Sequence, residues 1–93
     1  MSENELQEKI SEAALVLYQN KEGEAMQQVK ELLLIFQSMI QNQTKEQMET
    51  GGNFALLMQR ELLENYKSLD MIGMADCLME KATLFTQFYF QNK

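Results

Sequence analysis

Four acidic residues in the second half of the chain have the spacing of a divalent-cation site. Glu61 and Glu64 are three residues apart. Asp76 and Glu80 are four residues apart, so each pair lies on one face of a helix. On adjacent antiparallel helices the four carboxylates could meet and bind Mg²⁺, which prefers oxygen ligands. The alternative, which we favour, is that all four are solvated surface residues.

The segment Glu61-Leu62-Leu63-Glu64 resembles the Glu-x-x-Glu motif of the all-α nucleotide pyrophosphohydrolases. In that family a second motif, Glu-x-x-Asp, completes the metal site. The chain departs from the pattern there, because Asp76 and Glu80 have another order and spacing, and no basic or aromatic nucleotide pocket is evident. The resemblance implies a Mg²⁺-dependent nucleotide phosphohydrolase as the one enzymatic alternative.

The composition argues against most other chemistry. The 93 residues include no histidine, so the commonest general base and the commonest metal ligand are missing. The sequence also contains no Gly-rich phosphate loop and no pairing of Ser or Cys with His. We therefore predict a protein that is not an enzyme, with no catalytic or metal-binding residues and no cofactor.

The charge pattern limits the partners. The net charge is −6, from 14 acidic and 8 basic residues, and the basic residues are scattered singly. We expect no binding to nucleic acid or to an anionic membrane surface. The apolar segment 71–90 contains three central charges, which argues against a transmembrane helix. The polar N-terminal residues and the single cysteine, Cys77, favour the cytoplasm.

The elements that must position these residues are helices. The chain has no proline and only four glycines, and no stretch alternates with the period of a strand. We predict an all-α fold, a single domain of residues 1–93 that forms an antiparallel bundle of four helices arranged as two helical hairpins. The expected helices cover about residues 3–19, 24–43, 53–66 and 70–90.

The boundaries follow from local signals. Ser2 and Glu5 form a capping-box pattern at the start of the first helix. We place a turn at residues 20–23 and a longer loop at residues 42–53, where Gly51-Gly52 disfavours a helix and Asn53 caps the next one. Whether this glycine pair is a loop or a weak helix stays open. The third helix should turn five residues inward: Phe54, Leu57, Met58, Leu62 and Tyr66.

The helix over residues 70–90 is apolar on nearly all sides, which three companions in so short a chain cannot easily cover. Its Met-rich surface is typical of an adaptable interface, although filling of an irregular core is the alternative. The second helix is also apolar over more than one face. We predict a partner-binding surface that consists of Leu34, Ile35, Ile72, Met79, Leu84, Phe88 and Phe90.

Two segments resemble a recurring pattern in small all-helical proteins of Gram-positive bacteria that have no assigned activity. They are Leu62-Leu63-Glu64-Asn65-Tyr66 and the stretch from Asp70 to Ala75-Asp76-Cys77-Leu78. Residues 12–41 are similar to the first hairpin of these proteins. Some of them are encoded near motility genes, and the size resembles flagellar export chaperones. The chain departs from the pattern at residues 79–81, where that family tends to have an acidic-aromatic-acidic run.

From the residues we expect a protein-protein interaction module, adaptor or chaperone-like, that forms a dimer through its second and fourth helices. It would bury an amphipathic helix of a partner or of a second copy. The alternatives are the Mg²⁺-dependent phosphohydrolase and a small regulator that holds an apolar ligand inside the bundle.

Overall fold

The computed structural model describes residues 1–91, and helices account for nearly all of them. In chain order these are α1 (Glu3–Tyr18), α2 (Glu22–Gln41), α3 (Lys45–Lys67) and a C-terminal helix in three consecutive parts, α4 (Met71–Cys77), the π-helical turn η1 (Leu78–Ala82) and α5 (Thr83–Gln91). No strand occurs within the described range. The predicted all-α bundle is confirmed.

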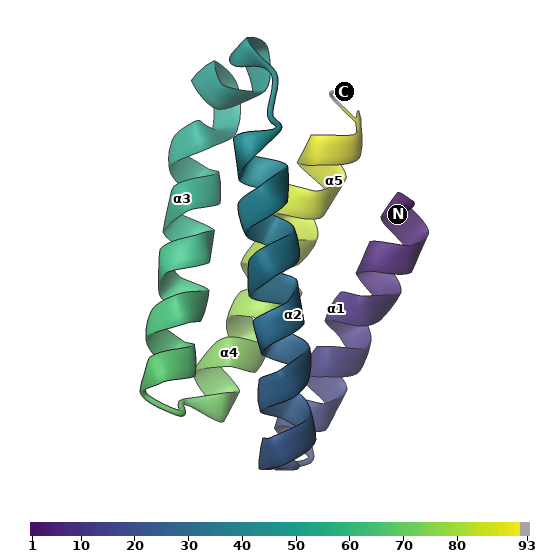
Figure 1. Ribbon diagram of the computed structural model, residues 1–93, viewed down its shortest axis with the longest axis vertical. Helices are drawn as coiled ribbons and strands as arrows, with labels where there is room; N and C mark the ends of the chain where they lie inside the picture. Colours follow the sequence, from purple (N-terminus) through teal and green to yellow (C-terminus); the bar gives the residue numbers. More distant parts are fainter. Residues whose placement is uncertain (92–93) are drawn as a thin grey trace.

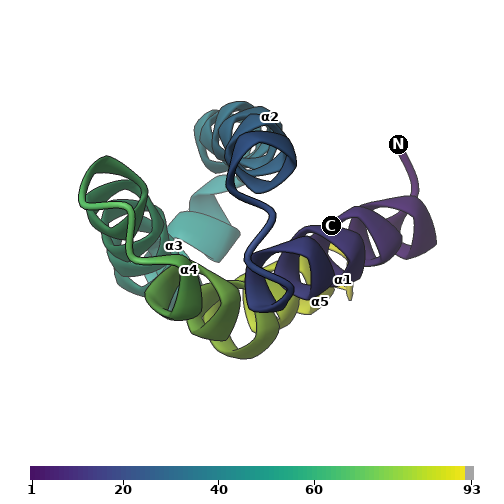
Figure 2. The ribbon, with the colours of Figure 1, turned by 90° about the horizontal axis from the view of Figure 1, so that it is seen from below.

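The helices run alternately up and down, so that each packs antiparallel to the next (Figure 1). Viewed from the end, α1 and α3 occupy opposite sides of the bundle, and α2 lies across from the C-terminal helix (Figure 2). Both α2 and the C-terminal helix pack on α1 and on α3. None of the helices within residues 1–91 is both long and apolar enough to span a bilayer.

Side chains at the helix starts explain where three of the helices begin. Ser2 and Glu5 form the predicted capping box of α1. Thr44 accepts a hydrogen bond from the backbone N–H of Gln47 and begins α3. The carboxylate of Asp70 accepts the backbone N–H of Gly73 at 2.9 Å and caps α4.

The core lies between the four helices and is almost entirely apolar. Each helix contributes residues at three- and four-residue spacing, as an amphipathic helix in a bundle must. At its centre Phe36 of α2 meets Phe85 of α5 edge to face, with ring centroids 6.1 Å apart. This contact joins the two helices that lie diagonally across the bundle.

The predicted loop at Gly51-Gly52 is wrong, since both glycines lie inside α3. The helix begins eight residues before the expected residue 53 because Thr44, and not Asn53, provides its cap. Gln47 then anchors the first turn, since its buried side chain donates to the carbonyl oxygen of Tyr89 at 2.9 Å. These contacts outweigh the weak helix propensity of two glycines, about 1 kcal/mol each.

The predicted inward face of α3 is partly wrong. Met58 and Leu62 are buried, but Phe54 and Leu57 are exposed, and Ala55 takes the inner position. The reason is helical geometry, because successive residues lie about 100° apart, so Leu57 points away from the side that Met58 and Leu62 share. A set that begins at Gln47 brings residues 51, 55, 58 and 62 to one side.

The C-terminal helix is continuous, as expected, but it contains the π-helical turn η1. There the backbone N–H of Thr83 reaches the carbonyl oxygen of Leu78, five residues earlier. The Thr83 hydroxyl also donates to the carbonyl oxygen of Leu78, at 3.0 Å, so this oxygen accepts two hydrogen bonds in the wide turn. One extra residue per turn shifts the helical phase, so that both Cys77 before η1 and Phe85 after it are buried.

The two short turns each contain a residue in the left-handed conformation. Asn20 has φ 60° between α1 and α2, and Leu69 has φ 57° between α3 and α4. Asparagine tolerates this conformation, whereas a bulky side chain rarely adopts it. The predicted first turn was slightly long, because α2 already begins at Glu22 and includes Gly23 in its first turn.

Candidate functional site

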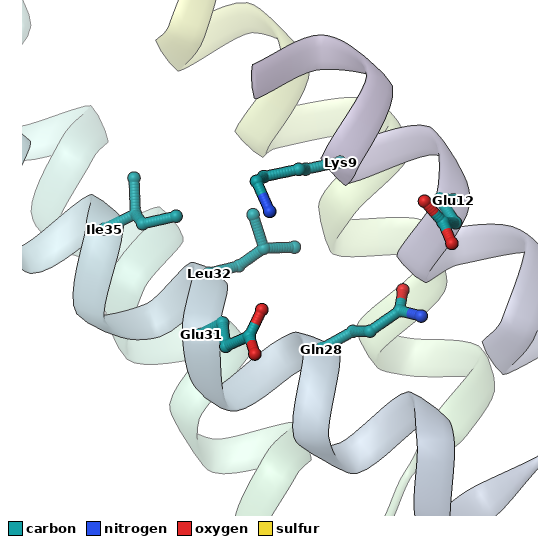
Figure 3. Close-up of a pocket in the computed structure, with 6 residues that line it drawn as sticks. All are labelled: Lys9, Glu12, Gln28, Glu31, Leu32 and Ile35. Carbon is teal, nitrogen blue, oxygen red and sulfur yellow. The ribbon is translucent and has the colours of Figure 1, made fainter. Parts of the chain in front are cut away.

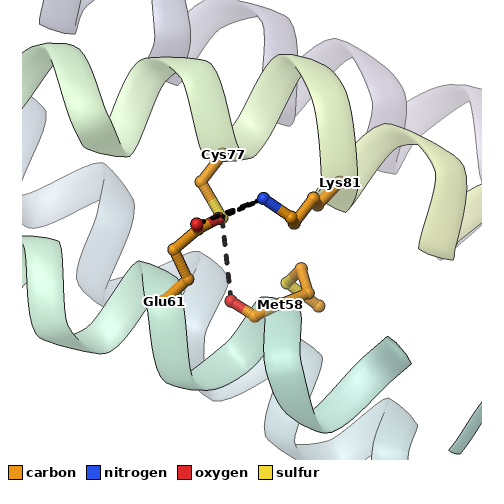
Figure 4. Close-up of polar contacts among 4 residues, drawn as sticks. All are labelled: Met58, Glu61, Cys77 and Lys81. Atoms are coloured by element: carbon orange, nitrogen blue, oxygen red, sulfur yellow. Dashed lines mark hydrogen bonds and ion pairs between the residues drawn. The ribbon is translucent and has the colours of Figure 1, made fainter. Parts of the chain in front are cut away.

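The four carboxylates of the hypothetical cation site do not come together. Glu61 on α3 pairs with Lys81 in η1, with 2.8 Å between Oε2 and Nζ (Figure 4). Asp76 instead accepts a hydrogen bond from the Tyr18 hydroxyl of α1 at 2.8 Å. Glu61 thus contacts the C-terminal helix from α3, whereas Asp76 on that helix contacts α1.

The other two acids, Glu64 and Glu80, point into solvent. Within residues 1–91 no three side chains of His, Cys, Asp or Glu are grouped closely enough to hold a metal ion. Sequence spacing placed each pair on one helix face, but it did not determine how the two helices are rotated relative to one another.

Cys77 places a free thiol inside the bundle. Its thiol is buried and lies 3.7 Å from the carbonyl oxygen of Met58, beside the Glu61 carboxylate (Figure 4). Burial, together with the neighbouring carboxylate, raises the pKa of the Cys77 thiol to about 12. A thiol that stays protonated is a poor nucleophile, so this cluster is suited to packing and not to catalysis.

The ion pair of Glu61 and Lys81, beside Cys77, stabilises the charged form of both side chains. The hydrogen bond from Lys81 lowers the pKa of Glu61, and the same bond raises the pKa of Lys81. Burial opposes the effect on Glu61 only in part. Both groups therefore remain charged near neutral pH and join α3 to the π-helical turn.

The predicted partner-binding residues fall on two separate sides of the molecule. Leu34 is exposed on α2, whereas Ile72, Met79 and Leu84 are exposed on the C-terminal helix, which lies diagonally across the bundle (Figure 2). Three others are half-buried, and two of these, Ile35 and Phe90, pack against the core. The third, Phe88, lies against Gly51. One interface through the second and fourth helices cannot include all seven.

The exposed residues of the C-terminal helix are interrupted by charge. Ile72 and Met79 are 56% and 46% exposed, but the exposed carboxylates of Asp76 and Glu80 lie between and beside them. Isolated apolar side chains of this kind are normal on protein surfaces. This side of the molecule is therefore a weaker candidate for an interface than the sequence suggested.

The more continuous apolar surface lies between α2 and α3. A groove with a volume of about 440 Å³ is lined there by Lys30, Leu33, Leu34, Gln37, Gln59, Leu63 and Tyr66. The Gln59 side chain crosses its floor and donates to the carbonyl oxygen of Leu33 at 3.0 Å. This bond joins α2 to α3 at the groove, where Leu34 and Leu63 remain exposed.

From the groove, a row of uncharged residues extends along α3 toward the start of the helix. They recur at three- and four-residue steps and form what we call the outer stripe of α3: Met48, Gly52, Leu56, Gln59, Leu63 and Tyr66. The stripe contains no charged residue, although 24% of the chain is charged. The groove and the outer stripe together are named the α2–α3 face.

Sequence reasoning missed the outer stripe because it began α3 at residue 53, which left out Met48 and Gly52, and because it turned Tyr66 toward the core. With the helix extended to Lys45, the three- and four-residue spacing from Met48 to Tyr66 is plain. The signal that could have revealed it was the pair Thr44 and Gln47, a capping-box spacing that precedes the glycines.

A second pocket lies between α1 and α2 and is polar (Figure 3). Its volume is about 300 Å³, and Lys9, Glu12 and Glu31 surround its mouth above the apolar side chains of Leu32 and Ile35. These charged residues are exposed. Because water already solvates such groups, the pocket offers little binding energy to a ligand.

No family model, curated protein or solved structure matches the chain. The assignment of a function therefore depends on the geometry described above.

Proposed function

We propose that this chain is a non-enzymatic protein-protein interaction module, adaptor or chaperone-like, and that the α2–α3 face is its binding surface. The observation that carries the proposal is a run of exposed leucines with no carboxylate among them. Leu34, Leu56 and Leu63 are 60%, 56% and 38% exposed. Depletion of charge around large apolar side chains is the composition that distinguishes the core of an interface from other surface.

The geometry of the face suits a helical partner. Two antiparallel helices form its walls, and the leucines of α3 recur at the spacing that contacts another helix. Gln37 adds an exposed amide group that can both donate and accept hydrogen bonds. An amphipathic helix that lies along the groove would cover the leucines, and burial of each leucine side chain contributes roughly 1.5–3 kcal/mol before the losses of association.

The proposal includes a location in the cytoplasm. Cys77 is a free, buried thiol, and a chain with one cysteine gains no internal disulfide from an oxidising compartment. The Glu61–Lys81 pair also supports the non-enzymatic part of the proposal. It uses one of the four candidate carboxylates for a structural contact.

Site-specific photocrosslinking in cells tests the proposal. A benzophenone amino acid at residue 34 lies on the α2–α3 face, whereas the same amino acid at residue 15 replaces Leu15, a leucine of similar exposure on α1. We expect protein adducts from residue 34 and few from residue 15. Equal adducts from both positions, or none from residue 34, would show that the face does not bind protein.

A further inference from the structure

The charges on the α2–α3 face favour one occupant, a second copy of this chain. Lys30 is the only charged residue of the face, while the whole chain carries −6. Copies that meet through other surfaces bring carboxylates together, and like charges in an interface disfavour association. Copies that meet through this face keep most of their acidic residues apart. This inference rests on the proposed function, because it names the partner that the same face would bind.

The positions of residues along the axes of α2 and α3 define the centre of the face. The hydrogen bond from Gln59 to the Leu33 carbonyl oxygen places these two residues level with each other. Leu34 therefore lies near the middle of the face. On α3, Leu56 and Leu63 are seven residues apart, about 10 Å along the axis, and Gln59 lies between them.

The rim of α3 has opposite charges at its two ends. Glu49 lies near the start of the helix and Lys67 at its end, and both are exposed. They are 18 residues apart, which corresponds to five turns at about 3.6 residues each, so they share one side of the helix. Antiparallel apposition of two α3 helices about Gln59 would bring Glu49 of each copy near Lys67 of the other. Arg60 lies nearest the centre of this arrangement, so the Arg60 side chains of the two copies would approach each other. Glu64, four residues later on the same helix, is at the spacing that offers each Arg60 an opposite charge.

The area of the face is adequate for a dimer. The 20 residues of α2 extend about 30 Å, and two packed helices with their side chains are roughly 20 Å wide. The flat area of this surface is roughly 600 Å², and the uneven outline of the side chains makes the accessible area larger. It is therefore close to the ~800 Å² of accessible surface that each partner contributes to a standard interface.

We propose that two copies pack through their α2–α3 faces about a two-fold axis perpendicular to the helices, with α3 antiparallel to α3. In this arrangement Leu56 of each copy packs on Leu63 of the other, and Glu49 pairs with Lys67 at both ends. The interface is isologous and closed, so association stops at the dimer.

Sedimentation equilibrium on the purified chain tests the association. We expect the wild type to sediment as a dimer at micromolar concentrations. Leu34→Glu should give monomers, because it places a carboxylate at the centre of the face. Leu15→Glu, the matched change on α1, should remain dimeric. Circular dichroism of both variants checks that each is folded. A monomeric wild type at 100-fold higher concentration, or monomers from both variants, would overturn the proposal.

Charge reversal tests the antiparallel arrangement. Glu49→Lys and Lys67→Glu should each weaken dimerisation roughly 3- to 10-fold, because each creates two like-charge pairs, and the double variant should restore it. Glu8→Lys on α1 makes the same change in net charge as Glu49→Lys away from the face, and it should not weaken the dimer. Absence of rescue in the double variant would overturn the arrangement.

The photocrosslinking experiment separates this proposal from the function on which it rests. Adducts from residue 34 with a different protein, together with a monomeric purified chain, would remove the second copy as the occupant and leave the binding function in place. Loss of both adducts and dimer would remove both.

Discussion

Gly51 of α3 lies directly against the ring of Phe88 in α5, so closely that a β-carbon at residue 51 would be 2.9 Å from Cε2 of the ring. The adjacent Gly52 has no such neighbour, since its β-carbon would meet only Met48 at 3.9 Å. The two glycines of one helix thus have different roles. The first permits close packing of α3 on α5, whereas the second has no contact that requires it.

This difference predicts unequal changes in stability for two similar variants. Gly52→Ala should raise the free energy of unfolding by about 0.5–1 kcal/mol, because alanine has the better helix propensity. Gly51→Ala should give a smaller gain or a loss, because the Phe88 ring must shift to make room. Urea unfolding followed by circular dichroism measures both. Equal stabilisation by the two alanines would show that Phe88 moves without penalty.

A second prediction concerns the Cys77 thiol, whose pKa burial raises to about 12. At pH 8 a thiol-specific reagent such as Ellman's reagent should modify the folded chain at least roughly 100-fold more slowly than the chain in 8 M urea, because the reactive thiolate is scarce and shielded. The measurement is the rate of thionitrobenzoate release. Similar rates in both conditions would mean that the α3–α4 contact opens readily.

The same shift predicts a loss of stability in alkali. The folded thiol has a raised pKa, so its contribution is complete below the ordinary value of about 8.5 and is lost as the pH rises toward 12. Cys77→Ala removes this dependence but also leaves a small cavity. Between pH 8 and pH 10 the wild type should therefore lose more stability than the variant does, as urea unfolding at each pH would show.

A third prediction concerns the ion pair between Glu61 and Lys81. The bond from Lys81 lowers the pKa of Glu61 in the folded state. The stabilisation is therefore complete above the unfolded value of about 4.3 and is lost as the pH falls through the lower, folded value. The effect should be small, because the Lys81 and Glu61 side chains are 29% and 38% exposed.

Lys81→Met, which retains most of the aliphatic stem, tests this coupling. The pKa of Glu61 should rise toward its ordinary value in the variant, as measured by NMR titration of its side-chain carboxyl carbon. The stability difference between variant and wild type should shrink as the pH falls through the lowered, folded pKa of Glu61 and the carboxyl becomes protonated in both. A Glu61 pKa that is the same in the two proteins would contradict the ion pair.

A fourth prediction follows from the left-handed conformation of Leu69. A leucine at φ 57° is strained by about 1–2 kcal/mol, and glycine is not. Leu69→Gly should therefore raise the free energy of unfolding by about 0.5–1 kcal/mol after the greater flexibility of unfolded glycine is subtracted. Asn20→Gly is the control, and it should gain less because asparagine tolerates the conformation. Destabilisation by Leu69→Gly would mean that the leucine side chain contributes packing that outweighs the strain.

The local features of the fold were predictable from the sequence. The capping box at Ser2 and Glu5, the cap at Asp70 and the apolar face of the C-terminal helix all depend on residues close together in the chain. The position of α3 was not predictable in this way. Its first turn depends on Gln47 bound to Tyr89, a contact over 42 residues of sequence.

The candidate site also has features that the sequence predicted and features that depend on the tertiary structure. Leu34 is exposed, as expected, but Leu56 and Leu63 were not selected, although both lie within the predicted helix, because the sequence does not show which side of α3 meets the core. Ile72, Met79 and Leu84 were selected correctly as exposed. Their distance from Leu34 across the bundle depends on the order of the helices around the core, which no periodicity reveals.

The sequence by itself determined the all-α class, the helix spacing and the shortage of catalytic side chains, because propensity, capping and composition are local properties. Only the tertiary structure decided that Gly51-Gly52 is helical, that the four acids stay apart and that a face without carboxylates runs along α2 and α3. The physical reason is that helix rotation is set by contacts between distant segments, such as Gly51 with Phe88 and Glu61 with Lys81. A rotation of one residue, about 100°, changes which side chains face a partner.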